Sequence, residues 1–113
     1  MSAITTHILD VSRGEPARGV TVLLEHETHE GWQVAGRGVT DTDGRLKFLQ
    51  EQDEMLEAGH YRLTFDTAGY FAGRETESFY PQVTVTFTVR DASAHYHVPL
   101  LLSPYGYSTY RGS

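Results

Sequence analysis

Apolar and polar residues alternate with a period of two along much of this chain. The alternation is clearest in three stretches, residues 20–27, 60–66 and 83–90. In the third stretch one face carries threonines and the other is apolar, with Val83, Val85, Phe87 and Val89. Successive side chains of a strand point to opposite faces of a sheet, so this pattern predicts half-buried strands. Weaker patterns predict five more strands, within residues 5–11, 32–40, 45–49, 95–102 and 105–110.

The breaks between these stretches predict turns and two short helix candidates. Asp43-Gly44 is a strong signal for a short hairpin, since glycine accepts the positive φ that such turns need. Residues 50–59 are acidic and end in a glycine suited to a helix C-terminus, and residues 67–73 form the second candidate. Several short strands at close spacing indicate an all-β sandwich or barrel. We expect residues 1–113 to form a single domain, as their number permits.

The last predicted strand favours self-association. A sandwich keeps open sheet edges, and such edges invite pairing with another copy of the chain. Residues 105–110 carry hydroxyl and aromatic side chains on both faces, much of which a monomer would leave exposed. We therefore expect an oligomer with this C-terminal strand at the interface.

Composition and charge exclude several functional classes. The net charge of −6 argues against nucleic acid as a partner, because phosphate binding needs a basic surface. The chain has no cysteine, which removes disulfides, thiolate metal sites and cysteine nucleophiles. The first residues resemble neither a leader nor a membrane span, so we expect a cytoplasmic protein that has no membrane partner.

Two histidines stand on the outward face of the strand predicted in "HYHVPLLL". Val98 and Leu100 belong to its core face, so His95 and His97 point away from the core. Three interpretations are open. The pair is solvated, or it binds a metal with a third ligand from His7, or it supplies a catalytic imidazole.

His7 and Arg45 are two further candidates from the first half of the chain. His7 lies inside a predicted strand, and Arg45 directly follows the Asp43-Gly44 turn. Each is most simply a solvated or hydrogen-bonded surface residue. The alternative for Arg45 is recognition of an anion or a carbonyl group through its planar guanidinium.

Four blocks of the sequence resemble a known family. They are "TTHILD", "TDGR", "FYPQVTVTF" and "HYHVPLLLSPYGYSTYRGS", and together they span almost the whole chain. They resemble the 5-hydroxyisourate hydrolases of the transthyretin-like family. The terminal "YRGS" separates these hydrolases from transthyretin proper, the hormone carrier, which lacks it. The resemblance implies a transthyretin-like sandwich of two four-stranded antiparallel sheets with one short helix, for which residues 67–73 become the better candidate.

The resemblance also implies an assembly and a reaction. The assembly is a homotetramer, a dimer of dimers, with active sites in a central channel. The reaction is hydrolysis of 5-hydroxyisourate to 2-oxo-4-hydroxy-4-carboxy-5-ureidoimidazoline in urate catabolism, without a metal or cofactor. The implied catalytic residues are His7, Arg45, His97 and Ser113, and the implied substrate-binding residues are Tyr110, Arg111 and Gly112. The alternatives are a carrier that uses the same channel, a zinc hydrolase and a purely structural sandwich.

These residue types suit the implied chemistry. Water needs a base as it attacks, the developing oxyanion needs donors, and the leaving nitrogen needs a proton. His7 and His97 can share the proton transfers, and Arg45 can stabilise negative charge. Which histidine activates water stays open. We expect Gly112 to let the chain bend so that Ser113 brings its hydroxyl and terminal carboxylate to the site, with His95 as a bystander.

Overall fold

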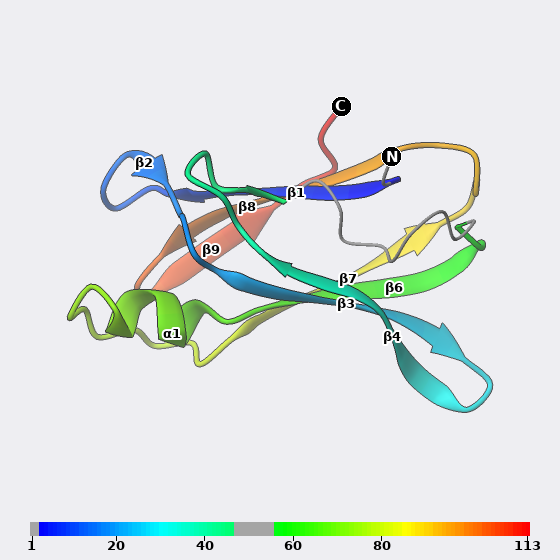
Figure 1. The fold of residues 1–113 in the computed structure, drawn as a ribbon, viewed down its shortest axis with the longest axis horizontal. Helices are drawn as coiled ribbons and strands as arrows, with labels where there is room; N and C mark the ends of the chain where they lie inside the picture. The colour runs from blue at the N-terminus through cyan, green and yellow to red at the C-terminus, as the bar shows by residue number, and fades with distance from the viewer. Residues whose placement is uncertain (1–2, 47–55) are drawn as a thin grey trace.

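The computed structural model describes residues 3–46 and 56–113 (Figure 1). Within these residues the chain forms nine strands and one helix. The elements are β1 (Ile4–Asp10), β2 (Glu15–Pro16), β3 (Thr21–Thr28), β4 (Gly31–Val39), β5 (Arg45–Leu46), β6 (Gly59–Phe65), α1 (Thr67–Ala72), β7 (Val83–Val89), β8 (Tyr96–Ser103) and β9 (Gly106–Thr109).

The strands form two sheets that pack face to face, with α1 at one end of the sandwich (Figure 1). One sheet has the order β4-β3-β6-β7, and each neighbouring pair in it is antiparallel. The other has the order β2-β1-β8-β9, with β5 also paired to β1. The predicted all-β, transthyretin-like sandwich with one short helix is confirmed.

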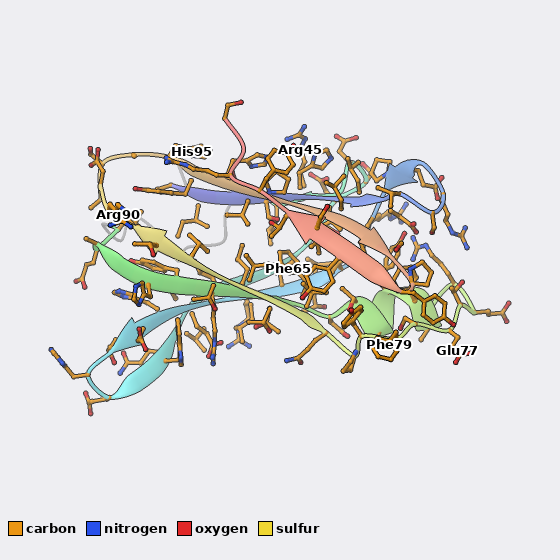
Figure 2. All side chains as sticks on the ribbon, turned by 180° about the vertical axis from the view of Figure 1, so that it is seen from behind. Arg45, Phe65, Glu77, Phe79, Arg90 and His95 are labelled. Atoms are coloured by element: carbon orange, nitrogen blue, oxygen red, sulfur yellow. The ribbon has the colours of Figure 1, made fainter. Side chains whose placement is uncertain are left out.

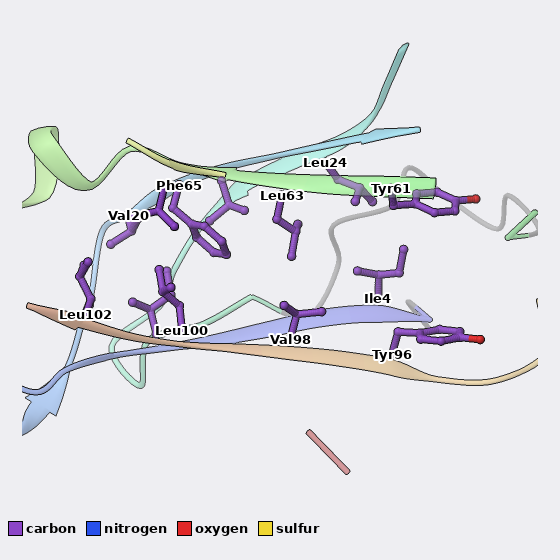
Figure 3. Packing of buried hydrophobic residues seen from close by; sticks show 14 of the residues in the cluster. Ile4, Val20, Leu24, Tyr61, Leu63, Phe65, Tyr96, Val98, Leu100 and Leu102 are labelled. Atoms are coloured by element: carbon purple, nitrogen blue, oxygen red, sulfur yellow. The ribbon is translucent and has the colours of Figure 1, made fainter. Parts of the chain in front are cut away.

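The core lies between the two sheets and follows the alternation in the sequence. Figure 3 shows side chains from both sheets meeting there, including Phe65, Leu63 and Leu100. Burial of this apolar surface is the main favourable term in folding such a sandwich. Val85 and Phe87 are only half-buried, although the pattern predicted them to face the core. They lie on β7, the edge strand of its sheet, where the core is open on one side.

One pair of strands differs from the expected antiparallel arrangement. β1 and β8 run parallel, in a register from Ile4↔Tyr96 to Asp10↔Leu102. The sheet that contains them is therefore mixed, and β5 makes it five-stranded. A tight hairpin forces its strands to be antiparallel, but no hairpin joins these two, so their direction is free of that constraint.

The Asp43-Gly44 turn is present, but it does not close a hairpin between paired strands. It carries the chain from β4 in one sheet to β5 in the other. Gly44 has a φ of +73°, and a Cβ atom there would overlap the carbonyl oxygen of Ile8. Its own carbonyl accepts a hydrogen bond from the backbone N–H of Ile8 at 2.8 Å. The glycine thus fixes the start of β5 against β1.

The helix forms in the second of the two predicted segments. Asp66 caps α1, accepting a hydrogen bond from the backbone N–H of Gly69 at 3.0 Å. The buried Tyr70 donates its hydroxyl hydrogen to the carboxylate of Asp10 at 2.7 Å, which ties the helix to β1. Residues 50–55 of the other candidate lie outside the described residues. Gly59 begins β6, so the helix C-terminus predicted there is wrong.

Candidate active site

The predicted catalytic side chains lie on the outward face of the five-stranded sheet. In the register of β1 and β8, Thr5 pairs with His97 and His7 with Pro99. β5 pairs with β1 so that Arg45 is the partner of His7. Figure 2 shows Arg45 and His95 on the same outer side of this sheet. Three strands from distant parts of the sequence therefore place the cation and the histidines on one surface.

A pocket of about 210 Å³ opens on this surface, and we call it the histidine pocket. Its lining residues are Thr5, Thr6, Arg45, Leu46, His95, His97 and Ser113. Three of the four residues predicted to be catalytic thus line one cavity. The fourth, His7, is the strand partner of Arg45, and its charge acts on His97.

The chain beyond β9 reaches the pocket through Gly112. Its backbone N–H donates to the carbonyl of His97 at 2.8 Å. A Cβ atom at Gly112 would lie 2.6 Å from Cδ2 of His97 and 3.2 Å from Cγ of Pro99. Gly112 does not adopt a positive φ, so this position does not use the left-handed backbone conformations that favour glycine. A glycine fits here because the backbone packs directly against the imidazole ring.

The pKa of His97 is lowered, so its ring is neutral and can accept a proton. Burial is the largest cause that lowers its pKa below the ordinary value of 6.5, and the nearby charges of Arg45, His7 and His95 add to it. All these influences disfavour the imidazolium form. His97 is therefore neutral at pH 7, as a general base must be.

Thr5 is a component of the site that we did not predict from the sequence. Its Oγ1 lies 2.8 Å from Nδ1 of His97 and 3.2 Å from Nε2 of His95. The two threonine–histidine contacts join residues about 90 positions apart, so no local sequence motif predicts them. His95, expected to be a bystander, lines the histidine pocket and shares the hydroxyl group with His97.

Arg111 and Tyr110 do not line the histidine pocket, although Nη2 of Arg111 donates to the backbone carbonyl of His95 at 3.4 Å. The guanidinium of Arg111 stacks over the ring of Tyr96, with its carbon 4.6 Å from the ring centre. Both residues line an apolar cavity of about 250 Å³, which we call the edge groove, together with Val85, Thr86, Phe87, Thr88, Tyr96, Val98 and Thr109. Neither is among the residues that line the histidine pocket. Their predicted contact with substrate stays a prediction.

The part of the chain that the structure describes has no cluster of three or more histidine, cysteine, aspartate or glutamate side chains able to hold a metal ion. Among the same residues, no helix has the length and apolar character needed to cross a bilayer.

Comparison with known proteins agrees with this geometry. The profile of the HIUase/Transthyretin family matches residues 4–112. The chain belongs to this family. It is 46% identical over 110 residues to the 5-hydroxyisourate hydrolase of Salmonella dublin, covering 97% of this chain and 80% of the relative.

Two solved structures of the family resemble this fold closely. The 5-hydroxyisourate hydrolase of Klebsiella pneumoniae is 39% identical, with a TM-score of 0.84, covering 97% of this chain and 92% of that one. Sea bream transthyretin, solved in complex with thyroxine, is 32% identical with a TM-score of 0.90, covering 98% and 95%. Hydrolases and a hormone carrier thus share this fold, and the residues in the pocket have to distinguish them.

Proposed function

We propose that this protein hydrolyses 5-hydroxyisourate to 2-oxo-4-hydroxy-4-carboxy-5-ureidoimidazoline in urate catabolism. One observation favours hydrolysis over carriage: Arg45, His97 and Ser113 line a single pocket, with His7 beside Arg45. The substrate is a small, flat, polar ring, and this set offers it hydrogen-bond donors and proton acceptors. The high identity to a named hydrolase over nearly the whole chain supports the same conclusion.

The proposed reaction uses the positions of these groups and the neutral form of His97. Neutral His97 takes a proton from water as the water oxygen bonds to a ring carbonyl carbon. Negative charge develops on the carbonyl oxygen, and the guanidinium of Arg45 stabilises it. The ring C–N bond then breaks, and a proton from His7 reaches the leaving nitrogen. The lowered pKa of His97 favours its neutral form, so we assign the activation of water to His97.

The proposed functional unit is a homotetramer formed by a dimer of dimers. β9 and β7 each form one edge of their sheets, and β9 ends beside the exposed Tyr110. Unpaired strand edges favour pairing with a second copy. Contact of Tyr110 and Arg111 with substrate requires a neighbouring subunit, because both line the edge groove in the single chain. We propose that Ser113 contributes its hydroxyl within the histidine pocket.

The direct test generates 5-hydroxyisourate in place from urate with urate oxidase and follows its ultraviolet decay. We expect the protein to accelerate this decay, and to do so equally after exhaustive chelation, because none of the proposed steps uses a metal. A decay rate equal to the spontaneous one would refute the hydrolase function. Activity lost on chelation and restored by zinc would point to the zinc hydrolase instead.

Carriage of a small aromatic molecule is the second candidate, favoured by the likeness to the thyroxine complex of sea bream transthyretin. The pocket described here is lined by histidine, arginine and hydroxyl groups, which an apolar carrier channel does not need. Tight calorimetric binding of thyroxine without hydrolytic activity would establish carriage. Hydrolytic activity without such binding would exclude it.

A further inference from the structure

Thr5 joins two histidines of the histidine pocket through one hydroxyl group. Its Oγ1 lies 2.8 Å from Nδ1 of His97 and 3.2 Å from Nε2 of His95, both within hydrogen-bond range. The parallel register of β1 and β8 sets this arrangement, because Thr5 is the strand partner of His97. One hydroxyl is thus held between two imidazoles, the side chain whose ordinary pKa lies near neutral pH.

The number of hydrogens on this hydroxyl limits the states of both rings. It carries one hydrogen, so it donates to only one ring at a time. When it donates to His95, the contact with His97 requires a proton on Nδ1 of His97, which leaves Nε2 as an open acceptor. A charged His95 must itself donate to Thr5. The hydroxyl hydrogen then turns to Nδ1 of His97, and the proton of neutral His97 moves to Nε2.

We propose that Thr5 is a positioning residue that sets the tautomer of His97 and makes it depend on the charge of His95. In this proposal neutral His95 carries its proton on Nδ1 and its Nε2 accepts from Thr5, so His97 holds its proton on Nδ1 and presents Nε2 to water. When His95 is charged, Nε2 of His97 carries a hydrogen and cannot accept a proton. The consequence for turnover rests on the proposed hydrolase function.

Thr5 is the described side chain that can set the tautomer of His97. Among the described residues, no other side chain makes a hydrogen bond to the His97 ring, and Nε2 has no partner. The titratable and charged groups that face His97 are Arg45 on β5, His7 on β1, His95 before β8 and the terminal Ser113. The guanidinium of Arg111 lies beside His95 and donates to its backbone carbonyl at 3.4 Å. Burial and the first three charges lower the pKa of His97, so the ring is neutral and has a tautomer to be set.

Three variants distinguish the effect of the Thr5 hydroxyl group from the effect of its β-branched side-chain shape. Thr5→Val keeps the β-branched shape and removes the hydroxyl, Thr5→Ser restores a hydroxyl, and Thr84→Val removes an exposed one from the other sheet. We expect Thr5→Val to lower kcat about 10–100-fold, as loss of an orienting partner does at metal sites. Thr5→Ser should stay close to the unmodified protein, and Thr84→Val should equal it. Failure of Thr5→Ser to retain turnover would overturn the proposal.

Nitrogen-15 NMR of the imidazole rings reads the tautomer without any substrate. With His95 neutral, we expect Nδ1 of His97 to be protonated, and its signal to change as His95 titrates. Thr5→Val should abolish this response. A His97 proton on Nε2 while His95 is neutral, or a response that survives in Thr5→Val, would overturn the proposal. If the response follows our expectation but the unmodified protein leaves 5-hydroxyisourate decay unchanged, the hydrolase function fails and the positioning role stands.

Discussion

His97 is the residue at which distant parts of the chain meet. Nδ1 of its ring contacts the hydroxyl of Thr5, and its backbone carbonyl accepts a hydrogen bond from Gly112. The ring is packed so closely against Gly112 that a methyl group there would overlap it. These contacts restrict both the position and the rotation of the imidazole, and burial keeps it neutral. Such restriction holds a reacting group near the geometry that its reaction needs.

We predict that His97→Asn lowers kcat/KM about 10²–10⁴-fold, the usual contribution of a general base. His97 must be neutral to accept a proton, so activity of the unmodified protein should fall as the pH drops through the pKa of His97. That pKa is depressed, which places this acidic limb below pH 6.5. Rates of 5-hydroxyisourate hydrolysis measured across pH will show whether the fall in activity at acidic pH disappears in His97→Asn.

A matched control for this substitution is His60→Asn. His60 and its ion-pair partner Glu27 both lie on the sheet that does not carry the site. His60 is exposed, so its replacement should leave the rate unchanged. His7→Asn should fall in the same range as His97→Asn if His7 protonates the leaving nitrogen. A loss of only a few-fold in either variant would assign that histidine to binding rather than to proton transfer.

Alternation along the sequence predicted where His97 points but not what it touches. The period of two correctly placed His97 opposite the buried Val98. The contact with Thr5 depends on the parallel register of β1 and β8, which single-strand patterns do not contain. The same alternation, extended beyond Thr109, would have placed Arg111 on the inner side, where it stacks on Tyr96.

At the scale of elements, β1 carries both the site and the main connection to the helix. Its outward residues Thr5 and His7 belong to the candidate site, whereas Asp10 is fully buried and accepts the hydroxyl hydrogen of Tyr70 from α1. Burial alone would raise the pKa of Asp10. Hydrogen bonds from Ser12, Tyr70 and the backbone outweigh burial and hold that pKa below its ordinary value of 3.8. Burial and the bond to Asp10 also raise the pKa of Tyr70 to about 12.

We predict that Tyr70→Phe lowers the free energy of unfolding at pH 7 by about 1.5–3 kcal/mol, the value of a hydrogen bond to a charged group. Asp10 has a depressed pKa in the folded state, so its stabilising effect is present at neutral pH and is lost as Asp10 becomes protonated. The difference between the two proteins should therefore shrink as the pH falls toward 3. Urea unfolding at several pH values measures it, with the exposed Tyr105→Phe as control. A pH-independent difference would contradict the role assigned to Asp10.

The strands themselves were predictable, whereas some of their connections were not. Each strand that the alternation predicted has a counterpart in the structure, although residues 47–49 lie outside the described part. The turn at Gly44 carries a hairpin signal but joins the two sheets, because its carbonyl hydrogen-bonds to Ile8 of β1. Local turn chemistry specifies the backbone angle and leaves the choice of partner strand to long-range contacts.

At the scale of the whole molecule, the segment after β9 links the site to the proposed assembly. Gly112 and Ser113 reach the histidine pocket, while Tyr110 and Arg111 line the edge groove between the open edges of the two sheets. Four consecutive residues thus touch two different surfaces. The histidine pocket and the edge groove are therefore joined by a short covalent segment.

We predict that deletion of residues 110–113 reduces turnover of 5-hydroxyisourate to the spontaneous rate and leaves the sandwich folded. The core residues all precede this segment, so the far-ultraviolet circular dichroism spectrum should be retained. Gly112→Ala should also impair turnover, because its methyl group would displace the His97 ring. Sedimentation of both variants reports the oligomeric state separately from the rate. Full activity in the truncated protein would remove this segment from the site.

The parallel pairing of β1 and β8 has a consequence for how the protein is made. A ribosome releases the first strand long before the strand that will lie beside it, since their paired residues are 92 positions apart. Until then β1 exposes backbone groups and alternate apolar side chains, which is a hazard for aggregation and a target for chaperones. Closing so long a loop also slows folding. The proposed site therefore forms only after β8 and the residues that follow β9 have been made, so turnover of 5-hydroxyisourate would report that this pairing is complete.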